Sequence, residues 1–159
     1  MASETWRERI PIFTGRAWAF GPDVAAALIV PAGRALEGAP ETHLFTAVDP
    51  AFPTRVQRGD FVVGGEFGAG TVDDAPVRAL GGAGIAAAIA CSFDATFADL
   101  ALAFGLPALE VNEALVIHTG ARLRVDLEGS RVVNLSSGDR YPIRNLTEAM
   151  LERLRRRDA

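Results

Sequence analysis

The sequence has no lysine, one cysteine and no long apolar run. All 16 basic residues are therefore arginine, a bias that we attribute to genomic base composition. The single cysteine, Cys91, excludes an internal disulfide, and it excludes a zinc or iron–sulfur site built by this chain alone, because such sites need several ligands. No segment reaches the roughly 18 apolar residues of a membrane-spanning helix, and residues 1–9 are polar, so we expect a cytoplasmic protein without a membrane partner.

Charge excludes a further class of partner. The formal net charge is −4, so the chain lacks the basic excess of a nucleic-acid-binding protein, and we expect no nucleic-acid partner. Hydrophobic residues make up 49% of the 159 positions, enough for a substantial core. We expect one domain over residues 1–159.

What the chain does contain is a strand, a glycine-rich turn and the start of a helix within residues 60–76. Phe61, Val62 and Val63 form a short apolar run, which is typical of a strand covered on both faces. The glycines between positions 64 and 70 allow backbone angles that side chains forbid. Such a turn directs N–H groups beyond the strand end and favours an anion, although many turns of this kind bind nothing.

The remaining pattern predicts further elements along the chain. We expect one or two strands in residues 10–20 with a turn at residues 15–16, a short helix within residues 24–30, a helix over residues 71–81, a buried parallel strand over residues 84–90, a helix over residues 93–104 closed by Gly105, strands over residues 106–110, 121–127 and 131–135, and a last helix capped by Thr147.

In order and spacing, these motifs resemble the small subunit of 3-isopropylmalate dehydratase, which is the swivelling domain of the aconitase superfamily. The matching stretches are residues 15–21, 28–31, 52–64, 67–70, 75–80, 84–93, 104–110 and 141–143. The resemblance implies an α/β fold of the aconitase-type swivelling β/β/α class. Its central, largely parallel sheet is flanked by helices and carries additional C-terminal strands. The resemblance also implies a hydro-lyase whose large subunit carries a [4Fe–4S] cluster, with no cofactor bound by this chain, which closes over the partner as a lid.

The chain departs from the family pattern where the family presents polar groups to substrate. The family turn continues Gly-Ser-Ser-Arg, in which the serine acts as base and the arginine holds a substrate carboxylate. Here Gly70 is followed by Thr71 and Val72, and the turn is one residue shorter. The family's Asp-Thr-Asp segment is replaced by alanines at residues 25–27, and the Arg and Asn expected after Ser-Phe are absent from residues 94–100. The resemblance therefore implies a kept scaffold with a degenerate active site.

Three residues are candidates for catalysis. Thr71 is the only hydroxyl near the family's base position, Cys91 ends a predicted strand, and His43 lies near the loop that selects the substrate in the family. Each has a plainer reading, since a free cysteine is often a small buried hydrophobe and His43 fits an exposed helical position. No metal ligands are expected in this chain.

Six residues are candidates for binding substrate: Gly68, Ala69, Gly70, Val72, Arg34 and Ser92. Asp73 and Asp74 stand where an anion would approach, close to the start of the predicted helix. Their charge suits the helix dipole and argues against binding a substrate carboxylate in the family's manner.

Two functions remain open. The first is a small subunit of an isopropylmalate dehydratase or aconitase-type hydro-lyase with an altered substrate or activity. The second is a repurposed, stand-alone swivel domain that binds a less polar ligand, as an enzyme of specialised metabolism or as a non-catalytic assembly protein. An exposed docking face would then favour a homo-oligomer.

Overall fold

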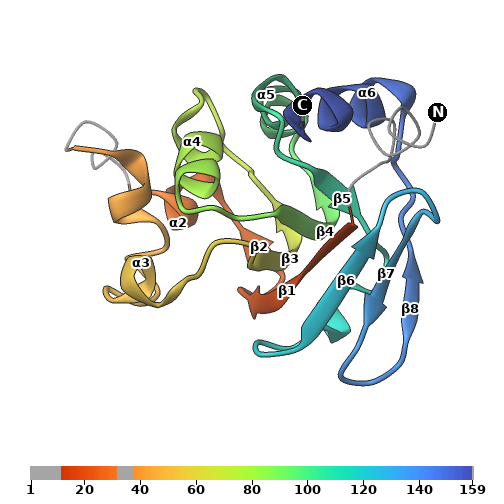
Figure 1. Ribbon diagram of the computed structural model, residues 1–159. Helices are drawn as coiled ribbons and strands as arrows, with labels where there is room; N and C mark the ends of the chain where they lie inside the picture. Colours follow the sequence, from red (N-terminus) through yellow and green to blue (C-terminus); the bar gives the residue numbers. More distant parts are fainter. Residues whose placement is uncertain (1–11, 32–37, 159) are drawn as a thin grey trace.

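The computed structural model describes residues 12–31 and 38–158, and its central element is a mixed sheet of eight strands (Figure 1). The strands are β1 (Ile12–Ala19), β2 (Asp23–Val24), β3 (Phe61–Phe67), β4 (Ala87–Phe93), β5 (Ala108–Glu110), β6 (Arg122–Asp126), β7 (Arg131–Asn134) and β8 (Arg140–Pro142). The helices are α2 (Ala26–Ile29), α3 (Phe52–Arg55), α4 (Ala75–Gly82), α5 (Ala95–Phe104) and α6 (Glu148–Asp158), with short 3-10 helices η2 (Pro40–His43) and η3 (Ala114–Val116).

The sheet has a parallel half and an antiparallel half. Its order is β5-β4-β3-β1-β6-β7-β8, in which β5, β4, β3 and β1 run parallel and each of the last three strands runs antiparallel to its neighbour. The parallel connections pass through α4 and α5, while tight turns join β6, β7 and β8. The predicted fold class, with a largely parallel sheet and additional C-terminal strands, is confirmed.

Strand β2 continues the line of β1 along the same edge of β3. Ala17 to Ala19 pair with Phe61 to Val63, and after a break at residues 20–22 the pair Asp23–Val24 lies beside Glu66 and Phe67. This close passage explains a glycine, because a Cβ on Gly65 would lie 2.5 Å from the carbonyl oxygen of Pro22. The break at Gly21 therefore depends on the absence of a side chain on β3.

The two faces of the sheet bury two hydrophobic clusters. The first cluster includes Val62, Phe67 and Phe97, and the second includes Val63, Ile89 and Leu123. Strands β3 and β4 contribute alternate residues to both clusters, as period-2 geometry requires. Their near-continuous apolar sequence is what a strand covered on both faces needs.

Helix ends follow recognisable capping chemistry. The carboxylate of Asp94 accepts the N–H of Phe97 at 3.1 Å at the start of α5, and Gly105 ends this helix in the left-handed conformation at φ 89°. At the start of α6 the hydroxyl of Thr147 accepts the N–H of Met150 at 3.2 Å. The predicted roles of Gly105 and Thr147 are therefore confirmed.

Several predicted boundaries are wrong. The turn expected at residues 15–16 is absent, because β1 is continuous there and pairs with β6 through Gly15 and Arg16. The helix expected from Thr71 begins at Ala75, since residues 68–74 are used by the turn. The strand expected over residues 84–90 runs from Ala87 to Phe93, which places Cys91 and Ser92 within it. None of the described helices is long and apolar enough to cross a membrane.

Candidate functional site

The glycine-rich turn leaves the carboxyl end of β3, the edge at which open parallel sheets gather ligands. Gly68 and Gly70 have φ values of 96° and 85°, which side chains strongly disfavour. Thr71 is buried, with 6% of its surface exposed, and its hydroxyl donates to the carbonyl oxygen of Gly68 at 2.6 Å. The Thr71 N–H reaches the same oxygen at 3.1 Å, so the turn is closed upon itself.

Neighbouring elements hold this turn on two sides. The Gly68 N–H donates to the carbonyl of Val24 at 2.7 Å, and the Ala26 N–H at the start of α2 donates to the carbonyl of Ala69 at 2.8 Å. On the other side Phe97 of α5 packs closely on the turn, so that a Cβ added to Gly68 would lie 2.6 Å from the Cβ of Phe97. The turn is therefore positioned by β2, α2 and α5 together.

The turn presents backbone donors to the space beyond the sheet. The N–H groups of Gly68 and Thr71 are used within the protein, whereas those of Ala69, Gly70 and Val72 find no protein acceptor among the described residues. Ala69, Gly70 and Val72 are exposed. Three of the four turn amides predicted to bind substrate thus have no protein acceptor among the described residues, and the Gly68 N–H serves a structural bond instead.

Carboxylates surround these donors. Asp23, Glu66 and Ser92 lie side by side on β2, β3 and β4 in strand register, and all three are exposed. Asp73 accepts the Ala75 N–H at 3.0 Å, and Asp74 stands at the N-cap of α4 without a side-chain capping bond. An incoming carboxylate would meet negative charge at this edge, so the site favours a ligand group of low negative charge.

Cys91 lies on the other side of the sheet from Gly68. It packs against the second cluster, and its thiol lies 3.6 Å from the carbonyl oxygen of Asn112. Gly68 contacts Phe97, which belongs to the first cluster. The structure therefore does not bring Cys91 and the turn together.

The other candidates are placed at different distances from the turn. Ser92 is exposed on β4 beside Glu66, close to the carboxyl end of β3. His43 ends η2, which packs on α4 with Glu41 beside Gly82, at the opposite end of α4 from the turn. Arg34 lies outside the described residues.

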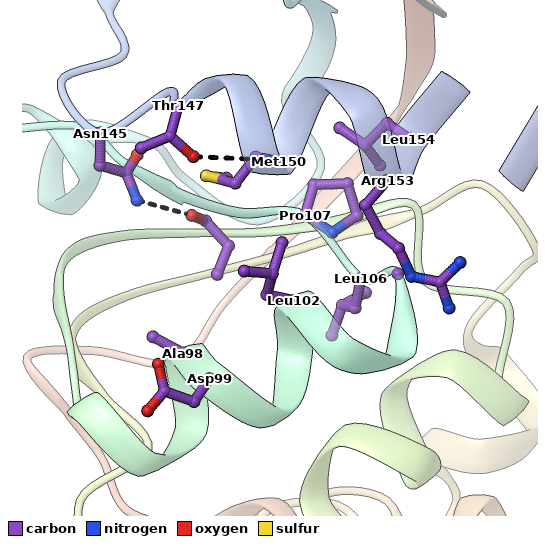
Figure 2. A pocket seen from close by; sticks show the side chains of 12 residues that line it. Ala98, Asp99, Leu102, Leu106, Pro107, Asn145, Thr147, Met150, Arg153 and Leu154 are labelled. Atoms are coloured by element: carbon purple, nitrogen blue, oxygen red, sulfur yellow. Dashed lines mark hydrogen bonds between the residues drawn. The ribbon is translucent and has the colours of Figure 1, made fainter. Parts of the chain in front are cut away.

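A cavity of about 180 Å³ lies elsewhere, between α5 and α6 (Figure 2). Its lining is mainly apolar, with Leu102, Leu106 and Met150 facing one another, and no residue of the turn lines it. Two of its polar side chains have structural partners: Asn145 bonds the backbone of Ala108 and Glu110, and Arg153 donates to the carbonyl of Ala103. The cavity therefore offers apolar volume with few unused polar groups.

Sequence reasoning missed two contributors to the site. The side chains of residues 25–27 were considered chemically silent, yet the backbone N–H of Ala26 fixes the turn. The sequence pattern places Glu66 within the glycine-rich turn and gives it no role, although it is the one residue of β3 that is exposed. A break in the apolar run of β3 at Glu66 was the available signal.

The described residues contain no group of three or more His, Cys, Asp or Glu side chains that could hold a metal ion.

Comparison with known sequences gives consistent relatives, although no family model matches the chain. A 3-isopropylmalate dehydratase small subunit of Nautilia profundicola is 34% identical over 145 residues, which cover 89% of this chain and 87% of the relative. The small subunit 1 of the same enzyme from Archaeoglobus fulgidus is 37% identical over 142 residues, with 87% and 88% covered. An isopropylmalate/citramalate isomerase small subunit of Methanocaldococcus jannaschii is 37% identical over 148 residues, with 89% and 87% covered.

Comparison with solved structures agrees with the sequences. A 3-isopropylmalate dehydratase from Methanocaldococcus jannaschii superposes with a TM-score of 0.82 at 27% identity, covering 93% of this chain and 95% of that one. An aconitase X from Thermococcus kodakaraensis gives a TM-score of 0.53 at 18% identity, covering 85% and 92%, and so shares the fold.

Proposed function

Because the chain belongs to the family of 3-isopropylmalate dehydratase small subunits, we propose that it acts as the small subunit of an aconitase-type hydro-lyase. In this role residues 1–159 form one swivelling domain that closes over a large subunit. The observation that carries the proposal is the turn at residues 68–72, anchored at the carboxyl end of β3, in which three exposed residues have amides without a protein acceptor among the described residues.

The [4Fe–4S] cluster of such an enzyme would belong to the large subunit. Fe–S clusters are held by several cysteine thiolates. This chain has one cysteine, Cys91, which packs against the second hydrophobic cluster of the core. The residues present do not fit the cluster, so the metal would be held by the large subunit, and this chain would supply the turn that faces it.

The residues of the turn would act on the part of the substrate that faces away from the partner. The N–H groups of Ala69, Gly70 and Val72 can bind a developing oxyanion. Thr71 is the candidate base, and its hydroxyl donates a hydrogen bond to the Gly68 carbonyl. To take a proton from substrate it would have to leave that bond and first give its own proton to solvent or to a group of the partner. Glu66, Asp73 and Asp74 disfavour a carboxylate here, and we propose that the substrate or the reaction differs from that of the relatives.

A second function is favoured by the apolar side chains that lie in and beside the turn. Ala69 and Val72 are exposed, and alanines occupy residues 25–27. A stand-alone swivel domain could hold a less polar ligand here, with the turn amides, Ser92 and Arg34 as anchors, either as an enzyme of specialised metabolism or as a non-catalytic assembly protein.

Co-expression with a candidate large subunit separates the two functions. The first function predicts a brown complex that co-elutes on size exclusion and hydrates or dehydrates a hydroxy acid. A colourless small chain that elutes without the large subunit would contradict it and favour the second.

Within an active complex, variants of Thr71 test the base. Thr71→Ser is expected to keep most of the turnover, whereas Thr71→Val is expected to lower kcat by about 100-fold, the usual contribution of a general base. Thr96→Val, at an exposed position of α5, is the matched control. Unchanged kcat in Thr71→Val would remove Thr71 as the base.

A further inference from the structure

One exposed face of the sheet is rich in arginine. Residues that alternate with the buried side chains of β1, β6, β7 and β8 point away from the second cluster, and five of them form what we call the arginine face: Arg16, Arg122, Arg124, Arg131 and Arg140. Strand register sets Arg124 and Arg140 on either side of Val133, and it sets Arg16 beside Arg122. The guanidinium groups are therefore arranged in rows by the backbone.

Most of this charge is not neutralised locally. Arg131 lies 3.5 Å from the carboxylate of Asp126, and Arg16 lies 3.9 Å from that of Asp60. In the part of the chain that the structure describes, no carboxylate pairs with Arg122, Arg124 or Arg140. Three guanidinium groups thus remain available to carboxylates from outside.

The arginine face also has apolar ground between its charges. A groove of about 300 Å³ is lined by Arg124, Asp126, Arg131, Val133, Leu135 and Arg140. Leu135 is 48% exposed within it. Arginine interleaved with aliphatic side chains is the composition of protein interfaces rather than of a solvated surface.

The same chain carries a complementary feature, the acidic tip formed by Val72, Asp73 and Asp74. Val72 is 87% exposed, more than any other large hydrophobic residue described. Asp73 uses one oxygen for the Ala75 N–H, and Asp74 caps α4 without a side-chain bond, so both retain acceptors. An apolar side chain followed by two carboxylates matches a groove with an apolar floor and a cationic rim.

Large polyanions fit this face less well. The net charge of the chain is −4 despite the arginine face, so the rest of the surface is strongly negative and repels nucleic acid or an anionic membrane at long range. A small acidic protrusion presents only a few carboxylates, and it contacts the arginines rather than the negative remainder of the surface.

We propose that the arginine face binds the acidic tip of a second copy of this chain. Val72 enters the groove beside Val133 and Leu135, and the carboxylates of Asp73 and Asp74 pair with Arg124 and Arg140. Because two different surfaces meet, the contact is heterologous and each copy keeps one free surface of each kind, so association continues beyond a dimer. The acidic tip belongs to the candidate site. If the proposed function holds, self-association therefore competes with docking on a large subunit. The contact between two copies does not itself depend on that function.

Sedimentation of the isolated full chain tests the contact. The weight-average mass is expected to rise continuously with concentration at low salt, and the association constant is expected to fall about tenfold in about 0.5 M NaCl because the contact is ionic. The variants Arg124→Glu/Arg140→Glu and Asp73→Arg/Asp74→Arg are each expected to stay monomeric. Mixed together they are expected to associate again, since each now complements the other.

The single variant Arg124→Glu is expected to weaken self-association. Arg58→Glu is its charge control, because Arg58 is exposed and lies outside the arginine face. It is expected to associate like the unaltered chain. A monomer at every concentration overturns the proposal. So does a closed dimer that ignores salt, or a mixture of the two charge-reversed variants that stays monomeric while both are folded by circular dichroism.

Discussion

Single residues determine how closely two segments of the backbone can approach each other, and glycine gives the clearest cases. Gly15 lies within β1, where an added Cβ would sit 2.1 Å from the carbonyl oxygen of Gly59. Gly70 is different, because a side chain there would meet no atom within 4 Å of the Cβ position. Its φ of 85° is instead a backbone conformation that residues with a Cβ rarely adopt. One glycine is required by space and the other by backbone angle.

These two requirements predict different losses. Gly15→Ala is expected to lower the free energy of unfolding by about 3 kcal/mol, since the backbone of Gly59 cannot move aside without disturbing β3. Gly70→Ala is expected to lower it by about 1 kcal/mol, the cost of a left-handed alanine. Urea unfolding of both variants measures the difference, and equal losses would show that the contact at Gly15 relaxes.

Asp49 is a residue whose ionisation the fold alters. The N–H of Ala51 and then the guanidinium of Arg55, which reach its carboxylate at 3.0 and 2.8 Å, hold the pKa of Asp49 below the ordinary 3.8. A pKa that is lower in the folded state stabilises the fold above pH 3.8, and this contribution is lost as the pH falls through the lowered value. Carbon-detected NMR should show Asp49 titrating below 3.8, and Arg55→Ala should move its pKa upward. A midpoint unchanged by Arg55→Ala would assign the shift to Ala51 alone.

At the scale of elements, α5 links the fold to the candidate site. Its first residues follow β4 directly, the Asp94 N–H donates to the carbonyl of Phe67 at 2.9 Å, and Phe97 packs on Gly68. The start of this helix and the start of the turn are therefore one packed unit, and a change in the cap of α5 reaches the turn.

The cap of α5 provides a test at this scale. Asp94→Ala is expected to lower the free energy of unfolding by about 1 kcal/mol because the Phe97 N–H loses its acceptor, while Asp94→Asn keeps an acceptor and should cost little. Thermal unfolding compares the two variants with the unaltered chain. Equal losses in Asp94→Asn and Asp94→Ala would show that the charge rather than the hydrogen bond matters.

At the scale of the whole molecule, β3 joins the two hydrophobic clusters. Val62 faces the first cluster and Val63 the second, and both have at most 1% of their surface exposed. Because a single strand supplies both clusters, neither can lose its packing while the other stays intact.

The shared strand predicts one cooperative transition. Val62→Ala and Val63→Ala are each expected to cost about 2 kcal/mol, with Trp18 fluorescence and Tyr141 near-ultraviolet signals moving together. Trp18 reports the first cluster and Tyr141 the second, and Trp6→Phe removes the other tryptophan. Two separate midpoints would show that the clusters unfold independently.

The sequence alone was sufficient for the family, the fold class and most elements, because each depends on local order. The apolar run of β3, the alternation of Leu123 and Val125, and the Gly105 terminus carry their structure in adjacent residues. The resemblance to dehydratase small subunits is confirmed by relatives at 34–37% identity. Gly15 suggested a turn, but it lies within β1. Glycine is needed there because the backbone of Gly59, distant in sequence, leaves no room for a side chain.

The tertiary structure alone decided what meets the turn. Three features depend on strand order and register. The sheet separates Cys91 from Gly68, the Ala26 N–H bonds to the turn, and the arginine face forms rows. Register brings together residues more than a hundred positions apart, such as Ile12 and Asp126, and no local pattern encodes it.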